Sequence, residues 1–72
     1  MLIYSKQQNI IVNTDLVKRI YISYELSPEI ISLAADNFIF VGYKNKETAQ
    51  KVLKQIFIAM TDGKKTFETP ED

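Results

Sequence analysis

One segment of the chain, residues 46–61, repeats apolar side chains at the spacing of an α-helix, and it is the one clear helix in the sequence. Its apolar positions follow the i, i+3, i+4, i+7 rule and are Ala49, Val52, Leu53, Ile56, Phe57 and Met60. Asn45 precedes the segment as a candidate N-cap, and Gly63 follows it in the C-cap region. In this chain of 72 residues, a single helix is therefore available to pack against the structure that the other residues form.

The residues before this helix predict short β-strands separated by polar turns. Residues 16–25 alternate apolar and polar side chains, as a half-buried strand does. Asp36 and Asn37 lie between two β-rich runs and tolerate the positive φ of a tight hairpin turn. The other expected strands cover residues 2–5, 10–12, 29–35 and 37–43.

These elements predict an α+β fold, an antiparallel sheet of about five short strands packed by one C-terminal amphipathic helix. We expect a single domain over residues 1–63 and a mobile C-terminal tail over residues 64–72. The run Phe38–Val41 is apolar on both faces, which is typical of a central strand. The expected core consists of Ile3, Ile20, Ile22, Ile31, Leu33, Phe38, Phe40, Val52, Leu53, Ile56 and Met60.

The composition removes most catalytic chemistry. The chain has no Cys and no His, so thiolate metal sites, disulfides and the commonest general base are absent. Its two glycines, Gly42 and Gly63, cannot form a Gly-rich phosphate loop. Asp15, Glu25, Glu29 and Asp36 lie at or near predicted turns, and their spacing does not pair them for catalysis. We therefore expect no enzymatic activity, no cofactor and no metal.

Charge and hydropathy limit the cellular compartment and the classes of partner that we expect for this chain. Nine basic and nine acidic side chains cancel, whereas binding of a nucleic-acid backbone needs concentrated positive charge. The apolar runs are too short to span a bilayer, and the N-terminus lacks the regions of a signal peptide. We expect a cytoplasmic protein that binds neither membrane nor, as its main role, nucleic acid.

A single helix cannot cover both faces of a flat sheet. Ile10–Val12, Ile30–Ile31 and Phe38–Val41 are apolar on both faces, so either the sheet curls or its second face meets another molecule. A two-fold homodimer is the simplest solution, with a protein target as a further possibility. Because Tyr and Arg dominate interface energetics and one Ile lies opposite the helix's apolar stripe, the expected partner-binding residues are Arg19, Tyr21, Tyr43 and Ile58.

The order of features also resembles a group of small uncharacterised proteins from Gram-positive bacteria and their phages. The residues that carry the resemblance are Ile10-Ile11-Val12-Asn13-x-Asp15, Val17-x-x-Ile20-x-Ile22, Ile30-Ile31, Val41-Gly42-Tyr43 and Ala49-x-x-Val52-Leu53-x-x-Ile56. In outline the expected sheet and helix are also similar to pleckstrin-homology-like domains. The resemblance implies a bacterial or phage cytoplasmic protein and assigns no activity and no site residue.

We interpret the chain as a non-enzymatic protein-interaction module that associates with itself. Two alternatives stay open. A phage- or mobile-element-encoded antagonist of a host protein would use the same surface on a different target. A nucleic-acid-binding accessory protein would use Arg19, Tyr21 and Tyr43 as a small stacking face.

Overall fold

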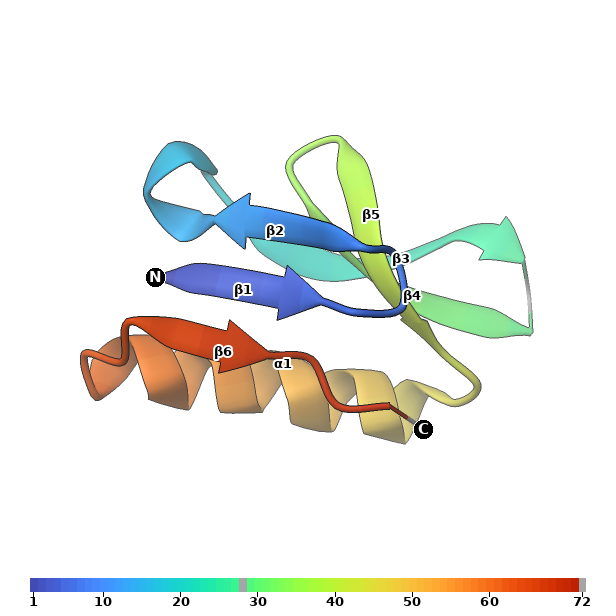
Figure 1. Ribbon diagram of the computed structural model, residues 1–72. Helices are drawn as coiled ribbons and strands as arrows, with labels where there is room; N and C mark the ends of the chain where they lie inside the picture. The colour runs from blue at the N-terminus through green and yellow to red at the C-terminus, as the bar shows by residue number, and fades with distance from the viewer. Residues whose placement is uncertain (28, 72) are drawn as a thin grey trace.

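The strands lie in two sheets that face each other, and the helix packs beside them (Figure 1). The computed structural model describes residues 1–27 and 29–71, with side chains described for all of these except 25–27. In chain order the elements are β1 (Leu2–Ser5), β2 (Ile10–Asn13), the 3-10 helix η1 (Thr14–Leu16), β3 (Ile20–Ser27), β4 (Ile30–Ala35), β5 (Phe38–Tyr43), α1 (Lys46–Thr61) and β6 (Thr66–Glu68). Sheet A has the order β2-β1-β6 and sheet B the order β3-β4-β5.

This arrangement corrects the expected architecture while keeping the α+β class. Six strands form two three-stranded sheets, so the prediction of one sheet of about five strands is wrong. The helix is followed by β6 and is therefore not the last element. Its bounds, and the N-cap at Asn45, agree with the sequence pattern, because the Asn45 side chain accepts a hydrogen bond from the Thr48 amide.

Strand β6 comes from the segment that the sequence predicted as a tail. It pairs in parallel with β1, so that Phe67 lies beside Ile3. The Leu2 amide donates to the Lys65 carbonyl, and the Thr69 amide donates to the Tyr4 carbonyl, which extends the pairing on both sides. Phe67 is half-buried against the core, and Asp72 lies outside the described residues. Part of the expected tail therefore belongs to a sheet.

Sheet B is built on a tight hairpin whose turn is the predicted one. Asp36 adopts a φ of 52°, and Ala35 pairs with Phe38 across the two turn residues. One extra residue in β5 shifts the register between Leu33 and Ala34, which is a β-bulge at Phe40. The bulge turns Phe40 and Val41 into the core together, so the run is apolar although β5 is an edge strand of its sheet.

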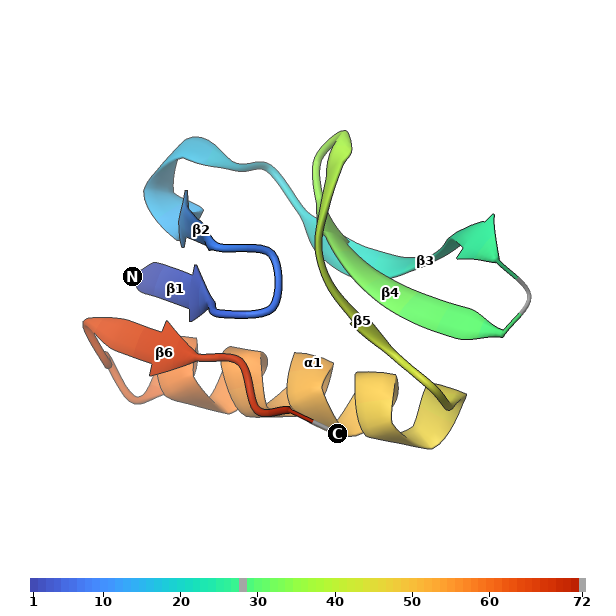
Figure 2. The same ribbon diagram turned by 45° about the vertical axis from the view of Figure 1, so that its right-hand side comes forward.

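The core forms where sheet A, sheet B and α1 meet (Figure 2). Ile3 and Val12 from sheet A, Leu33 and Phe40 from sheet B, and Ile56 from the helix are all buried. Of the expected core residues, Phe38 and Met60 are exposed. Phe38 lies at the hairpin end, and the last turn of α1 extends past the strands that would cover Met60. Both positions match the period of their element, but nothing packs over them.

Two side chains of the β1–β2 hairpin join sheet A to the edge of sheet B. The Ser5 hydroxyl donates to the Phe40 carbonyl. The Gln7 amide pairs with both main-chain groups of Gly42, with Nε2 to the carbonyl at 2.9 Å and the Gly42 amide to Oε1 at 2.8 Å. Gln7 thus satisfies the free edge of β5 as a neighbouring strand would.

The role of β6 predicts the effect of removing it. A chain that ends at Gly63 loses the parallel pairing with β1, the Phe67 packing and the bond from the Tyr43 hydroxyl to the Pro70 carbonyl. We expect its free energy of unfolding to fall by about 3 kcal/mol or more. Urea denaturation followed by circular dichroism measures this. A matched chain that ends at Glu71 should match the full chain, and unchanged stability of the shorter one would restore the interpretation of residues 64–72 as a tail.

Candidate functional site

The structure brings together two of the four residues that the sequence singled out as partner contacts. Arg19 immediately precedes β3 and Tyr21 is its second residue, and the Arg19 guanidinium carbon lies 5.3 Å from the centre of the Tyr21 ring. The Tyr21 hydroxyl donates to the Asp36 carbonyl, which fixes the ring across the sheet. The exposed Arg19 guanidinium therefore rests against a ring that the sheet holds in place.

Asp36 positions this pair from the β4–β5 turn, which lies beside the start of β3. Its Oδ1 accepts from the main-chain amides of Lys18 at 2.9 Å and Arg19 at 3.1 Å, and its own amide donates to the Arg19 carbonyl at 3.0 Å. Asp can do this because it tolerates the left-handed conformation that the turn requires. A turn residue thus orders the irregular segment that leads into β3.

The prediction that Tyr43 is a surface contact is wrong. Its side chain is 1 % exposed, and its hydroxyl donates to the Pro70 carbonyl at 2.8 Å. Tyr43 pairs with Ile31 on the core face of sheet B, because the bulge at Phe40 resets the alternation of β5. A pattern of residues alone does not show this change of phase.

Ile58 is exposed, as predicted, but it stands apart from Arg19 and Tyr21. It is 47 % exposed on the side of α1 that faces away from the sheets. Its neighbour Phe57 is more exposed, at 68 %, although it belongs to the apolar stripe of the predicted helix. Successive helical residues project about 100° apart, so the two side chains belong to different surfaces of α1.

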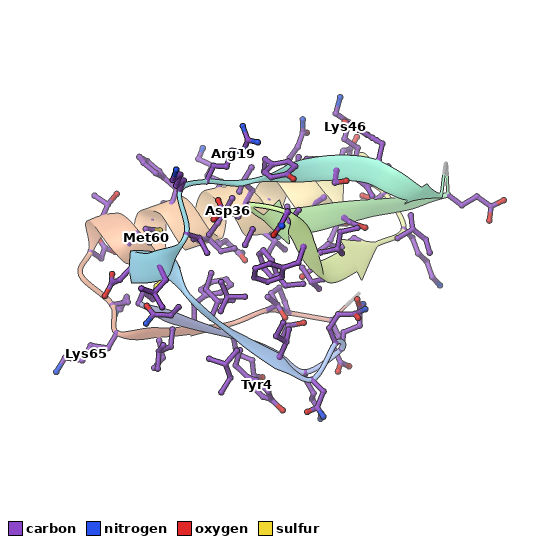
Figure 3. The ribbon with its side chains drawn as sticks, turned by 90° about the horizontal axis from the view of Figure 1, so that it is seen from above. Tyr4, Arg19, Asp36, Lys46, Met60 and Lys65 are labelled. Atoms are coloured by element: carbon purple, nitrogen blue, oxygen red, sulfur yellow. The ribbon has the colours of Figure 1, made fainter. Side chains whose placement is uncertain are left out.

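Phe57 forms one wall of an open hollow of about 360 Å³. The helix contributes Leu53, Ile56, Phe57 and Met60, and the facing wall consists of Thr14 and residues 17–20. We call this feature the hollow. It lies where the end of α1 and the segment between η1 and β3 diverge, and Figure 3 shows Met60 and Arg19 on this side of the molecule. Arg19 is thus the predicted residue that lines it.

Sequence reasoning missed most of the hollow for a definable reason. Phe57 and Met60 continue the helical apolar stripe, and Val17 and Ile20 lie in a segment predicted as a strand. Ile20 and Met60 were expected in the core, so no open surface was predicted between these two segments. The signal in the sequence was the width of the apolar stripe on the helix. This stripe is wider than the part of a helix surface that a three-stranded sheet covers.

The described residues include neither a metal-binding cluster nor a helix that could cross a membrane. Among them, no group of three or more His, Cys, Asp or Glu side chains is placed to hold a metal ion. In the described part of the chain, no helix combines the length and the hydrophobicity that a membrane crossing requires. The hollow itself offers apolar side chains, one hydroxyl and the two cations Lys18 and Arg19.

No protein-family model, curated protein or solved structure matches the chain. The resemblance to small proteins of Gram-positive bacteria and their phages therefore stays a prediction, and the function has to be argued from the surface.

The bonds of Asp36 predict distinct effects for three substitutions. Asp36→Ala removes the acceptor for two amides and strains the left-handed turn, so we expect the free energy of unfolding to fall by about 2 kcal/mol. Asp36→Gly also removes the acceptor, but Gly adopts the left-handed conformation without strain. The free energy of unfolding should therefore fall by about half as much as in the Ala variant. Asp36→Asn keeps both an acceptor and turn tolerance, so its stability should stay within about 0.5 kcal/mol. Urea denaturation of the three variants compares them, and equal losses for Gly and Ala would show that turn strain contributes nothing.

Proposed function

We propose that the chain is a non-enzymatic protein-interaction module that associates with itself through the outer face and free edge of the β1–β2 hairpin. The observation that carries the proposal is an apolar patch on the face of sheet A that is turned away from the core. Leu2, Tyr4 and Ile11 are exposed there, and Ile11 is 64 % exposed. Figure 3 shows Tyr4 on the opposite side of the molecule from Arg19.

These three side chains are neighbours by the register of the sheet. Tyr4 pairs directly with Ile11 across the strands, and Leu2, two residues from Tyr4 on β1, lies diagonally from Ile11. The buried side chains of the same strands, Ile3 and Val12, point the other way into the core. A contiguous exposed apolar patch is favoured at contacts between molecules.

Strand β2 also offers a free backbone edge. In sheet A its one neighbour is β1, and the main chain of Tyr4 is directed to β6, since its carbonyl accepts from Thr69. Because pairing alternates along an antiparallel ladder, the main-chain groups of Ile11 are directed outward from β2. Residues 10–13 contain no charge and no Pro, the usual devices that protect an edge.

A two-fold axis beside β2 would satisfy both features at once. Antiparallel pairing of β2 with β2 of a second copy continues sheet A from one chain into the other. Residues opposite each other in such a pair project to the same face, so the patches of the two copies would merge. The absence of His and Cys from the sequence supports a binding role over catalysis.

Solution mass tests this proposal. The native chain should have twice the 8.3 kDa mass of one copy in light scattering, and Ile11→Lys should weaken the association at least about tenfold, because the ammonium opposes burial at the shared edge. Ile58→Lys is the matched control, since it makes the same change at a similarly exposed Ile on α1.

The possible results separate clearly. A dimer that Ile11→Lys dissociates and Ile58→Lys leaves intact supports the β2 interface. A dimer with the reverse response would move the interface to α1 and contradict the proposed surface. A native chain that stays monomeric up to about millimolar concentration would contradict self-association altogether.

A further inference from the structure

The hollow exposes apolar surface that the fold leaves uncovered. Phe57 is 68 % exposed and Met60 47 % exposed, although both continue the apolar stripe of α1. Leu16, which precedes the facing wall, is also exposed. Phe, Met and Arg are enriched where proteins meet, and all three occur at this hollow.

The charged side chains of the hollow have one sign. Lys18 and Arg19 line it, and no carboxylate does. Among the described residues, neither cation forms an ion pair with a carboxylate, and the nearby Asp36 carboxylate accepts hydrogen bonds from their main-chain amides. Lys54 lies one helical turn before Phe57 and adds a third positive charge beside it.

The stacked Arg19 is suited to a carboxylate partner. Its guanidinium rests against the Tyr21 ring, which the Asp36 carbonyl holds through the hydroxyl. A planar guanidinium in a fixed position loses less freedom when it binds a carboxylate with two parallel hydrogen bonds.

From these observations we infer that the hollow binds an acidic amphipathic helix of a partner protein, with apolar side chains against Phe57 and Met60 and carboxylates facing Lys18 and Arg19. The inference rests on the proposed role as an interaction module but uses a different surface from self-association. From Leu53 to Met60 the helical wall rises about 10 Å, the length over which a partner helix presents two or three apolar anchors.

Other occupants fit the same surface less well. A second copy bound through this hollow by a two-fold axis would bring Lys18 and Arg19 of both chains together with no carboxylate in the lining. A small molecule is normally enclosed on most sides, whereas the Phe57 wall is itself exposed. A nucleic-acid backbone gains nothing from a floor of Leu53, Ile56 and Met60.

Selected peptides provide the test. A random library of peptides of about 15 residues, long enough for helix formation, is selected on the native chain, and the enriched peptides are titrated by fluorescence anisotropy. We expect net-negative peptides with apolar residues at helical spacing. Phe57→Ser should weaken their binding at least about tenfold, because Phe57 is the anchor surface. Ile58→Ser, at the adjacent exposed apolar position outside the hollow, is the matched control and should change binding less than about twofold.

Charge reversal tests the chemistry of the partner. The double variant Lys18→Glu with Arg19→Glu should bind the acidic peptides at least about tenfold more weakly and should itself select net-positive peptides. Both substitutions leave the main-chain bonds to Asp36 available, and urea denaturation checks that each variant remains folded. Amide chemical shifts should move at residues 17–20 and around Phe57.

Several results would overturn the inference: no enriched peptide, enrichment of neutral or basic peptides by the native chain, or binding that Phe57→Ser leaves unchanged. Dissociation of a native dimer by Phe57→Ser would assign the hollow to a second copy instead. The variant Ile11→Lys keeps the tests separate, because it should abolish self-association while leaving peptide binding intact. Failure of one proposal therefore does not imply failure of the other.

Discussion

The contacts of Ser5 and Gln7 with the edge of β5 determine how the two sheets meet. Through them the β1–β2 turn closes onto Phe40 and Gly42, and Ile3 and Val12 are brought against Leu33 and Phe40. The molecule is thereby closed at the end that holds this turn. At the other end of sheet A, where η1 leads into β3, residues 17–20 and the last two turns of α1 form the two walls of the hollow.

Much of this fold could be predicted from local signals. The apolar periodicity of residues 46–61 and the Asn45 cap predict the helix. Asp36 and Asn37 predict the hairpin turn because both residue types tolerate positive φ. Strand β6 has no such signal, since Thr66–Glu68 is three residues long and pairs with β1 across almost the whole chain. Long-range parallel pairing leaves no local trace, so one sheet and a tail were expected instead of two sheets.

The candidate site was predicted less well, for a related reason. Arg19 and Tyr21 were identified by residue type, and their contact depends on Asp36, which local turn chemistry places. Tyr43 was misplaced because one bulge inverted the alternation. Periodicity identifies the apolar face of an element but not what packs against that face, so Met60 was assigned to the core although it is exposed.

The neutral net charge of the chain conceals an uneven distribution of charge. Equal numbers of acidic and basic side chains argue against general electrostatic binding to nucleic acid, yet Lys18 and Arg19 line the same hollow as Phe57. The patch around Ile11, by contrast, is formed by uncharged residues on a strand without charge. An uncharged strand edge is suited to pairing with an identical copy, because a two-fold axis places identical residues beside each other. A surface with charge of one sign requires a partner with charge of the opposite sign. The two surfaces therefore differ in the kind of partner that each can accept.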